Sequence, residues 1–296
     1  MKHFFFSIAT GILCFGFLIP VCCHAASLRI VASSQDVRVG DVFFADVILT
    51  QDNSPINSGE ISLTFDTTHL YVQGVSTGNS LFTLWLRTPV FSNATGKIFF
   101  VGGTPNGIEK DGRLARIIFL ATRQGIADIA FENGKGQYLY ANDGKGTVIP
   151  PKLQPLSFSI GSQRADRIRD DWSVIVEADV TPPHDIQITL GKDEVIFSGK
   201  YFISFSARDE ESGIKSYEVR QGKRGKFTSS ESPVVLQNQF FPVPISVKAI
   251  DKAGNEAVAT FMPDIRPPVI FWILLALCCM TVIGIIICYY KIQRRI

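Results

Sequence analysis

Glu60-Ile61-Ser62-Leu63-Thr64-Phe65, followed by Asp66-Thr67-Thr68, is the stretch that decides the fold. Polar and apolar side chains alternate strictly over its first six residues, which is the pattern of a β-strand with one buried face. Asp66 follows at once, and an aspartate side chain can hydrogen-bond the backbone of its own turn. The stretch therefore predicts a half-buried strand that ends in a tight turn, with Leu70 and Val72 on the core side of the next strand.

Similar short strands continue on both sides of this stretch, from Leu28 to Ile160. They are separated by turn residues, of which Gly102-Gly103-Thr104-Pro105-Asn106-Gly107 is the longest run. The other predicted strands are Val42–Leu49, Lys97–Val101, Leu114–Ala121, Ile126–Phe131 and Gln137–Ala141. About nine strands with little helical periodicity predict an all-β antiparallel sandwich. Asn93-Ala94-Thr95, between two of these strands, fits a glycosylation sequon.

Several short motifs follow one another along this region. They are Val39-Gly40-Asp41, Ile56-Asn57-Ser58-Gly59-Glu60, Leu63–Val72, Gly96-Lys97-Ile98, Asp111–Ile117, Ala127–Phe131 and Ala141–Gly144. In this order they resemble the cohesin family, jelly-roll modules of bacteria and archaea, although Thr67 stands where that family usually has proline. The resemblance implies a cohesin-like jelly-roll sandwich over residues 27–160.

The resemblance also implies a binding role. Cohesins that take part in cellulose-degrading complexes bind dockerin modules through a flat sheet face, where they typically offer an amide and a carboxylate. By resemblance that face would include Ser58 and Glu60, with Ser58 in place of the amide. The alternative is that these two side chains are only the solvated side of an edge strand.

A second β-domain is predicted over residues 181–263, because six or seven strands follow Thr181-Pro182-Pro183. Two stretches, Ala207–Val219 and Val247–Glu256, resemble bacterial immunoglobulin-like repeats, which implies an Ig-like β-sandwich. Asp209, Glu210 and Glu211 form an acidic group whose oxygens suit calcium. The alternative is a solvated turn, and no other cofactor or metal is predicted.

Residues 161–180 between the two domains are expected to form a charged linker, since they offer little to bury. A short helix through Ala165–Asp171 fits the sequence, and Trp172–Val176 could pack against a neighbouring domain.

Val269–Tyr290 is apolar throughout except for Thr281 and gives about 33 Å of helix at about 1.5 Å per residue, enough to span a bilayer. The tail at residues 291–296 is basic, so the C-terminus is expected on the cytoplasmic side. Residues 1–26 have the layout of a signal peptide with cleavage after Ala25 or Ala26, the alternative being a retained signal anchor. Both domains are therefore expected outside the cell.

All six cysteines lie in these two terminal segments, which excludes disulfides and thiolate chemistry from the domains between them. The chain carries a net charge of +2, but without Lys2 and the three cations of the tail the remainder is slightly acidic, so no basic face points to nucleic acid. We find no nucleophile elbow, HExxH motif or phosphate-binding loop.

The sequence as a whole predicts a non-catalytic, single-pass, membrane-anchored surface protein. Its first domain is expected to bind an extracellular protein module, dockerin-like, or a polysaccharide. The alternatives are a purely structural envelope protein and a polysaccharide-acting hydrolase, whose two acids could lie far apart in the sequence.

Overall fold

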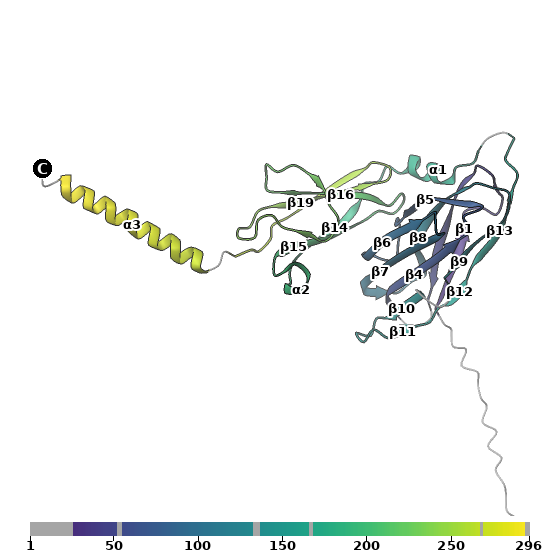
Figure 1. The fold of residues 1–296 in the computed structure, drawn as a ribbon, viewed down its shortest axis with the longest axis horizontal. Helices are drawn as coiled ribbons and strands as arrows, with labels where there is room; N and C mark the ends of the chain where they lie inside the picture. The colour runs from purple at the N-terminus through teal and green to yellow at the C-terminus, as the bar shows by residue number, and fades with distance from the viewer. Residues whose placement is uncertain (1–25, 52–54, 133–136, 166–167, 267–268, 294–296) are drawn as a thin grey trace, which may run out of the picture.

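The computed structural model describes residues 26–51, 55–132, 137–165, 168–266 and 269–293. Its order is a large β-sandwich, a short linker helix, a smaller β-sandwich and a long C-terminal helix (Figure 1). The all-β fold predicted from the sequence, with one apolar C-terminal helix, is confirmed. The predicted signal peptide falls on residues 1–25, outside the described residues, apart from its last residue, Ala26.

Two sheets form the first domain. The five-stranded sheet has the order β12 (Lys152–Gln154), β1 (Ser27–Ala32), β3 (Val42–Thr50), β8 (Gly112–Ala121) and β5 (Leu70–Ser76). The eight-stranded sheet runs β11 (Val148–Ile149), β10 (Gln137–Ala141), β4 (Ile56–Phe65), β9 (Gly125–Phe131), β13 (Leu156–Gly161) and β2 (Val37–Arg38), with β7 (Lys97–Ile108) beside β4 and β6 (Leu84–Ser92) beside β7.

The core of the first domain lies between these sheets, where the apolar positions of each alternating strand meet. Ile61, Leu63 and Phe65 of β4 are buried as the alternation predicts. The Phe119 ring packs 5.6 Å from the Phe43 ring and 5.7 Å from the Phe65 ring, joining the two sheets. Burying such side chains stabilises the domain by about 1.5–3 kcal/mol each.

The predicted turn at Gly102–Gly107 is wrong, because β7 continues through it to Ile108. The two glycines allow close packing rather than a turn. A Cβ on Gly102 would lie 2.5 Å from the Phe82 ring, and one on Gly103 would lie 2.5 Å from the Asn57 carbonyl oxygen. Glycine in a strand often marks such a close approach.

The second domain is also a two-sheet sandwich, with a three-stranded and a four-stranded sheet. Its strands are β14 (His184–Lys192), β15 (Tyr201–Arg208) and β18 (Val234–Val235) in one sheet, and β17 (Thr228–Ser229), β16 (Ile214–Gln221), β19 (Ile245–Asp251) and β20 (Glu256–Phe261) in the other. A single turn of helix, α2 (Glu194–Phe197), joins β14 to β15. Seven strands in two sheets are typical of immunoglobulin-like domains.

The helix of the linker, α1 (Asp171–Ala178), begins where the predicted helix at Ala165–Asp171 would end. The reason is a cap: the Asp170 carboxylate accepts hydrogen bonds from the backbone N–H groups of Trp172 and Ser173. The charges of the linker are not simply solvated. Arg164 pairs with Asp41, and Asp171 accepts a 2.6 Å hydrogen bond from Ser33 of the first domain.

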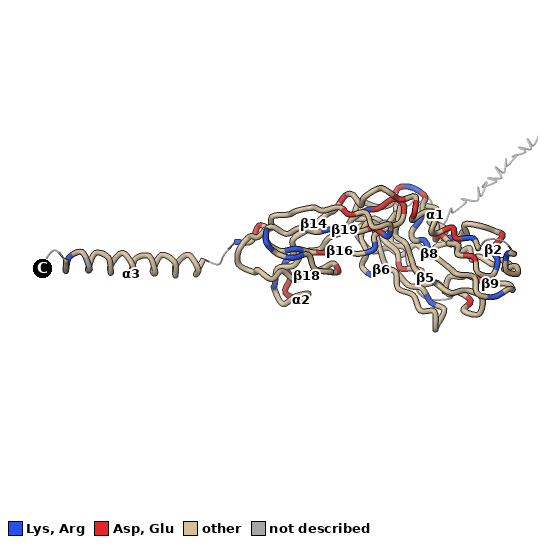
Figure 2. The backbone as a smooth tube through the Cα atoms, turned by 90° about the horizontal axis from the view of Figure 1, so that it is seen from above, with Lys and Arg blue, Asp and Glu red and all other residues tan. Residues whose placement is uncertain are grey.

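The C-terminal helix, α3 (Val269–Gln293), projects away from both domains and carries almost no charge along its length (Figure 2). Its residues Val269–Ile287 are long and apolar enough to cross a membrane, by length and composition.

Candidate functional site

The outer face of β4 carries both residues that the family resemblance pointed to. Ser58 and Glu60 lie on the side of the strand opposite the buried Ile61 and Leu63. β4 is not an edge strand, because β10 and β7 pair with it on its two sides. Ser58 and Glu60 therefore lie in the middle of a broad sheet face, and we call the outer side of β10, β4, β7 and β6 the β4 face.

On the β4 face, Glu60 has serines before and after it along β4 and apolar side chains on the two neighbouring strands. In register, Tyr138 of β10 lies beside it on one side and Val101 of β7 on the other. Ser58 is placed likewise between Tyr140 and Gly103. The Tyr138 and Tyr140 rings are 6.5 Å apart. Tyrosine is enriched at protein interfaces, so these two rings favour a binding role for this face.

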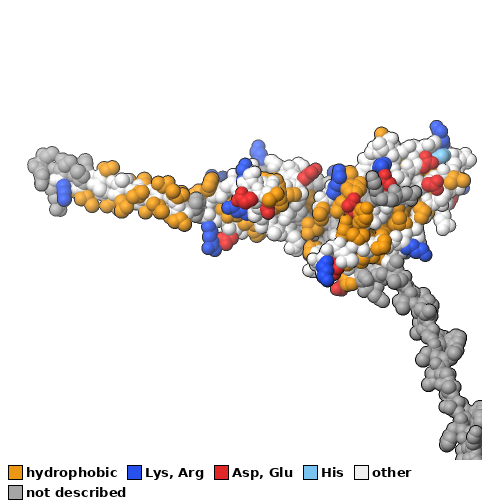
Figure 3. Space-filling view, turned by 60° about the horizontal axis from the view of Figure 1, so that its bottom comes forward, with side chains coloured by type: hydrophobic (Ala, Val, Ile, Leu, Met, Phe, Trp, Pro, Cys, Tyr) orange, Lys and Arg blue, Asp and Glu red, His pale blue; other side chains and the backbone are white. Residues whose placement is uncertain are grey.

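Strand β6 enlarges the apolar part of this face. Leu84 and Val90, which lie opposite Gly103 and Phe99 of β7, are exposed, and Leu86 in the bulge is 78% exposed. Hydrophobic side chains gather on the surface of the first domain in the space-filling view (Figure 3). The sequence did not predict this strand as an element, because bulges at Trp85/Arg87 and Arg87/Val90 interrupt its alternation.

The sequence analysis also missed Asn57. A bulge in β4 between Ile56 and Ser58 places Asn57 next to Ser58, whose hydroxyl donates to the Asn57 Oδ1 over 2.9 Å. The strand thus presents an amide, a hydroxyl and a carboxylate in succession. The resemblance had placed Ser58 where that family typically has an amide, and the amide of this chain lies one position earlier, in the bulge. Bulges leave little trace in a sequence, so no pattern would have found it.

Charges on the β4 face are few and mostly engaged. The Arg87 guanidinium lies 5.1 Å from the centre of the Phe99 ring. At one end of the face Lys97 pairs with Glu132 at 2.6 Å, and Glu132 also accepts from Ser62. The Glu60 carboxylate makes no hydrogen bond or ion pair with the residues that the structure describes. It is therefore open to a donor on a partner.

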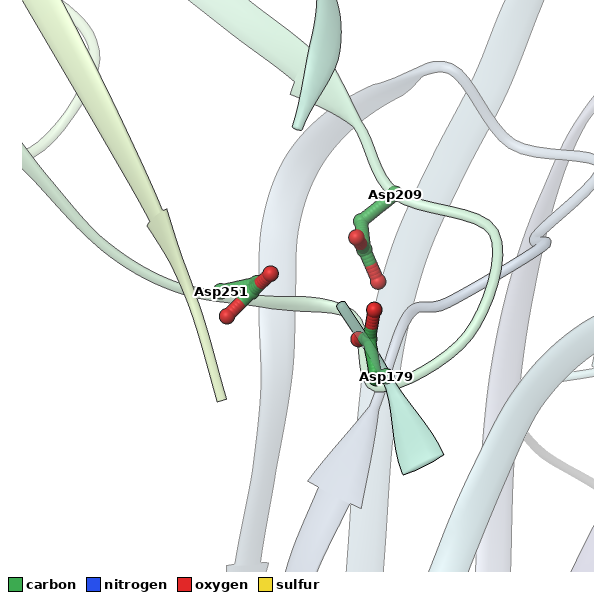
Figure 4. Close-up of side chains that lie close together, drawn as sticks. All are labelled: Asp179, Asp209 and Asp251. Carbon is green, nitrogen blue, oxygen red and sulfur yellow. The ribbon is translucent and has the colours of Figure 1, made fainter. Parts of the chain in front are cut away.

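The predicted calcium residues are distributed differently from expectation. Asp209 lies in a group with Asp179 and Asp251, in which one carboxylate oxygen from each residue falls within 4.8 Å of the other two. Glu210 is exposed and lies 3.5 Å from His184. Glu211 is exposed at the rim, where interaction with Asp179 raises its pKa. The Asp209 and Asp179 carboxylates point toward one another (Figure 4).

Sequence reasoning missed Asp179 and Asp251 as partners of Asp209. Asp179 caps the C-terminal end of α1, Asp209 follows β15, and Asp251 ends β19. Three chain segments far apart in sequence meet there, so only the fold brings the group together.

No family model and no curated protein matches this chain. The solved structures that it resembles include the seventh ScaB type I cohesin of Pseudobacteroides cellulosolvens, with 20% identity over 48% of this chain and 96% of that chain and a TM-score of 0.40. The non-cellulosomal cohesin of Archaeoglobus fulgidus has 22% identity over 47% and 94% of the two chains and a TM-score of 0.38. A type I cohesin–dockerin complex of Clostridium thermocellum has 18% identity over 45% and 99% and a TM-score of 0.38. All three are cohesins, the family that the sequence motifs resemble.

Proposed function

We propose that this chain is a membrane-anchored, non-catalytic binding protein whose β4 face holds an extracellular protein module. The observation that carries the proposal is the Glu60 carboxylate, free of described partners, between Tyr138 and Val101 on a broad apolar face. Aromatic and arginine side chains are the residue types that dominate binding energy at protein interfaces. Tyr138, Tyr140 and Arg87 supply them here.

The β4 face suits a folded module better than an extended strand. β4 already has partners on both sides, so an added strand could pair with this sheet only at an outer edge, such as β6, and not beside Glu60. A sheet face that carries one carboxylate beside tyrosine and aliphatic side chains instead fits a module that presents an apolar patch with a lysine, arginine or hydroxyl donor at its centre. Dockerin, the partner in the Clostridium thermocellum complex, is the first module to test.

A glycan is the second ligand class, favoured by the neighbouring Tyr138 and Tyr140 rings, which could form a platform for a sugar ring. The full chain in lipid nanodiscs separates the two classes when it is assayed against a panel of dockerin modules and on a glycan array. Binding to neither, together with an envelope defect when the gene is deleted, would favour the purely structural alternative.

Variants of the β4 face test where binding occurs. Glu60→Arg reverses the charge at the centre of the face, and Val101→Asp places a charge at the apolar position beside it. Each should weaken binding at least about tenfold, the effect of losing about 1.4 kcal/mol. Glu177→Arg, at an exposed position of α1, makes the same charge change away from the face and should leave affinity unchanged. Equal affinity for all four proteins would refute a role for the β4 face, provided that their melting temperatures agree.

Membrane anchoring is supported by the length and composition of α3. Near the start of α3 the Phe271 ring packs 5.2 Å from the ring of Phe241, which lies in an exposed loop of the second domain. Lys215 is exposed on β16 and reports the orientation. An impermeant amine reagent should label Lys215 in intact cells, and protection of Lys215 would contradict an external ectodomain.

A further inference from the structure

The group of Asp179, Asp209 and Asp251 lies where the linker meets the second domain, and its carboxylates are held in place by neighbouring donors. Asp179 accepts from the backbone N–H of Thr181 at 3.0 Å. Asp251 accepts from the backbone and side-chain N–H groups of Asn255 at 2.8 and 2.9 Å. Asp209 accepts from the backbone N–H groups of Glu211 and Gly213. These bonds fix the orientation of all three side chains.

Three buried carboxylates without a cation would repel one another. Asp179, Asp209 and Asp251 are each buried, and among the described residues no lysine, arginine or histidine nitrogen lies within 4.0 Å of any of them. The partly buried Lys252, next in sequence to Asp251, is near enough for a Coulombic interaction with Asp209. Its amine donates instead to the Val75 carbonyl oxygen of the first domain and contacts none of the three carboxylates. Burial, together with the nearby Asp179, raises the pKa of Asp209. Buried charges are ordinarily paired or bound to a metal.

Two polar atoms at the group have no hydrogen-bond partner among the described residues. One is Oδ2 of Asp209, whose residue is only 6% exposed. The other is the hydroxyl of the fully buried Ser212, whose backbone N–H donates to the Asp179 carboxylate at 3.1 Å. Such atoms are rare in folded proteins, and each calls for a ligand or another physical explanation. The Ser212 hydroxyl adds a buried oxygen that does not belong to the acidic residues.

We propose that Asp179, Asp209 and Asp251 bind one Ca²⁺ ion, with the Ser212 hydroxyl at the same site. Calcium takes oxygen ligands at about 2.3–2.6 Å, so oxygens on opposite sides of the ion lie about 4.6–5.2 Å apart. One carboxylate oxygen from each of the three residues lies within 4.8 Å of the other two, which fits one such coordination sphere. A Ca²⁺ ion also supplies the missing positive charge.

This ion strengthens the joint between the two domains. The loop from Asp209 to Gly213 holds the site on one side and contacts the first domain on the other. The Asp209 carbonyl oxygen accepts from the backbone N–H of Asn79 at 2.8 Å, and the Ser212 carbonyl oxygen accepts from the Ser76 hydroxyl at 2.7 Å. Asp179 brings the end of the linker to the same ion. Ca²⁺ therefore orders three segments whose positions together set the joint.

The full chain, purified in detergent and freed of metal with EGTA, tests the site by calorimetric titration with CaCl₂. We expect one Ca²⁺ per chain and a melting temperature that rises with Ca²⁺ concentration. Asp209→Asn and Asp251→Asn should each weaken Ca²⁺ binding at least about tenfold, whereas Asp264→Asn, at an exposed residue outside the group, should not. Without Ca²⁺, Asp209→Asn should raise the melting temperature, because it removes a repulsive charge.

If a variant fails to fold, Ca²⁺ binding and melting of the wild-type chain still test the site. Absence of Ca²⁺ binding and of any Ca²⁺ effect on melting at 5 mM would overturn the site. Amide hydrogen exchange tests the joint: Ca²⁺ should slow exchange at Asn79, whose N–H is bonded to Asp209 across the domain boundary. Binding of Ca²⁺ with unchanged exchange at Asn79 would overturn the role in the joint.

Discussion

The hydroxyl of Ser76 in the first domain donates to the carbonyl oxygen of Ser212 in the second over 2.7 Å, and both residues are fully buried. Neighbouring contacts follow the same boundary, including the bond from Asn79 to Asp209. On the linker side, the Lys252 amine lies 5.5 Å from the Trp172 ring of α1. The two sandwiches are joined by a packed, hydrogen-bonded contact, which gives the linker little freedom.

Gly78→Ala should loosen this contact. A Cβ at Gly78 would lie 2.6 Å from the carbonyl oxygen of Glu211, and backbone on both sides cannot move aside without separating the domains. We expect amide exchange at Asn79 to become at least about tenfold faster, which corresponds to a loss of about 1.4 kcal/mol. Gly74→Ala is the matched control, since a Cβ there meets nothing within 4 Å. Equal exchange in the two variants would show that the domains do not depend on close packing at Gly78.

Asn93→Ala should destabilise the first domain by about 1–3 kcal/mol, the effect of removing two hydrogen bonds and leaving backbone groups unpaired. The Asn93 side chain accepts from the Val72 N–H at 2.8 Å and donates to the Val72 carbonyl oxygen at 2.9 Å. Urea unfolding measures the change. Thr95→Ala destroys the same sequon but leaves this amide in place, so it should cost much less. Comparable losses in both variants would contradict the anchoring role of Asn93.

Acid should weaken the turn that follows β4. Partial burial acts to raise the pKa of Asp66, but hydrogen bonds from His69, at 2.6 Å, and from Thr68 keep it below its ordinary value. The folded chain therefore holds this proton less tightly than the unfolded chain. The stabilisation is present above about pH 4 and is lost as the pH falls through the lowered pKa.

Asp66→Asn removes this contribution. The variant should be less stable than the wild type at pH 6, and the difference should shrink as the pH approaches 2, as measured by urea unfolding at each pH. Asp128→Asn, which removes an exposed carboxylate of β9, controls for net charge. A stability difference that stays constant with pH would contradict the role of the Asp66 carboxylate.

Signal peptidase should cut after Ala25, not after Ala26. Ala26 is fully buried in the core of the first domain, and its carbonyl oxygen accepts from the Lys152 N–H at 2.8 Å. Cutting after Ala26 would remove that acceptor and leave a gap beside β12. N-terminal sequencing of the mature protein should read Ala26-Ser27-Leu28. A first residue of Ser27, or an uncut N-terminus, would contradict this expectation.

Local sequence patterns predicted the regular parts of the fold. The alternation ending at Phe65 placed β4, and Asp66 accepts from Thr68 in its own turn, as its position predicted. Features that depend on close packing were missed. Gly102 and Gly103 look like turn residues in the sequence, yet they lie within β7. Glycine is needed there because Phe82 and β4 approach them too closely for a side chain.

The two sites show the same limit. Ser58 and Glu60 were named from the family resemblance, but Asn57 joins them through a bulge that follows no periodicity. The sequence predicts Glu210 and Glu211 as the partners of Asp209, whereas in the structure it lies beside Asp179 and Asp251. Contacts between distant segments depend on where the strands end relative to one another in space. A single sequence does not show which strands pair or in which register.

Only residues 262–268 separate β20 from α3, a stretch that reaches at most about 25 Å at about 3.3–3.6 Å per residue. With α3 in a bilayer, the second domain would stay close to the lipid surface, and the first domain would lie farther from the membrane. A small change of angle at the junction would then swing the β4 face through a much larger arc. The tilt of that face, and so the direction from which a partner approaches, would be set at the contact between Ser76 and Ser212.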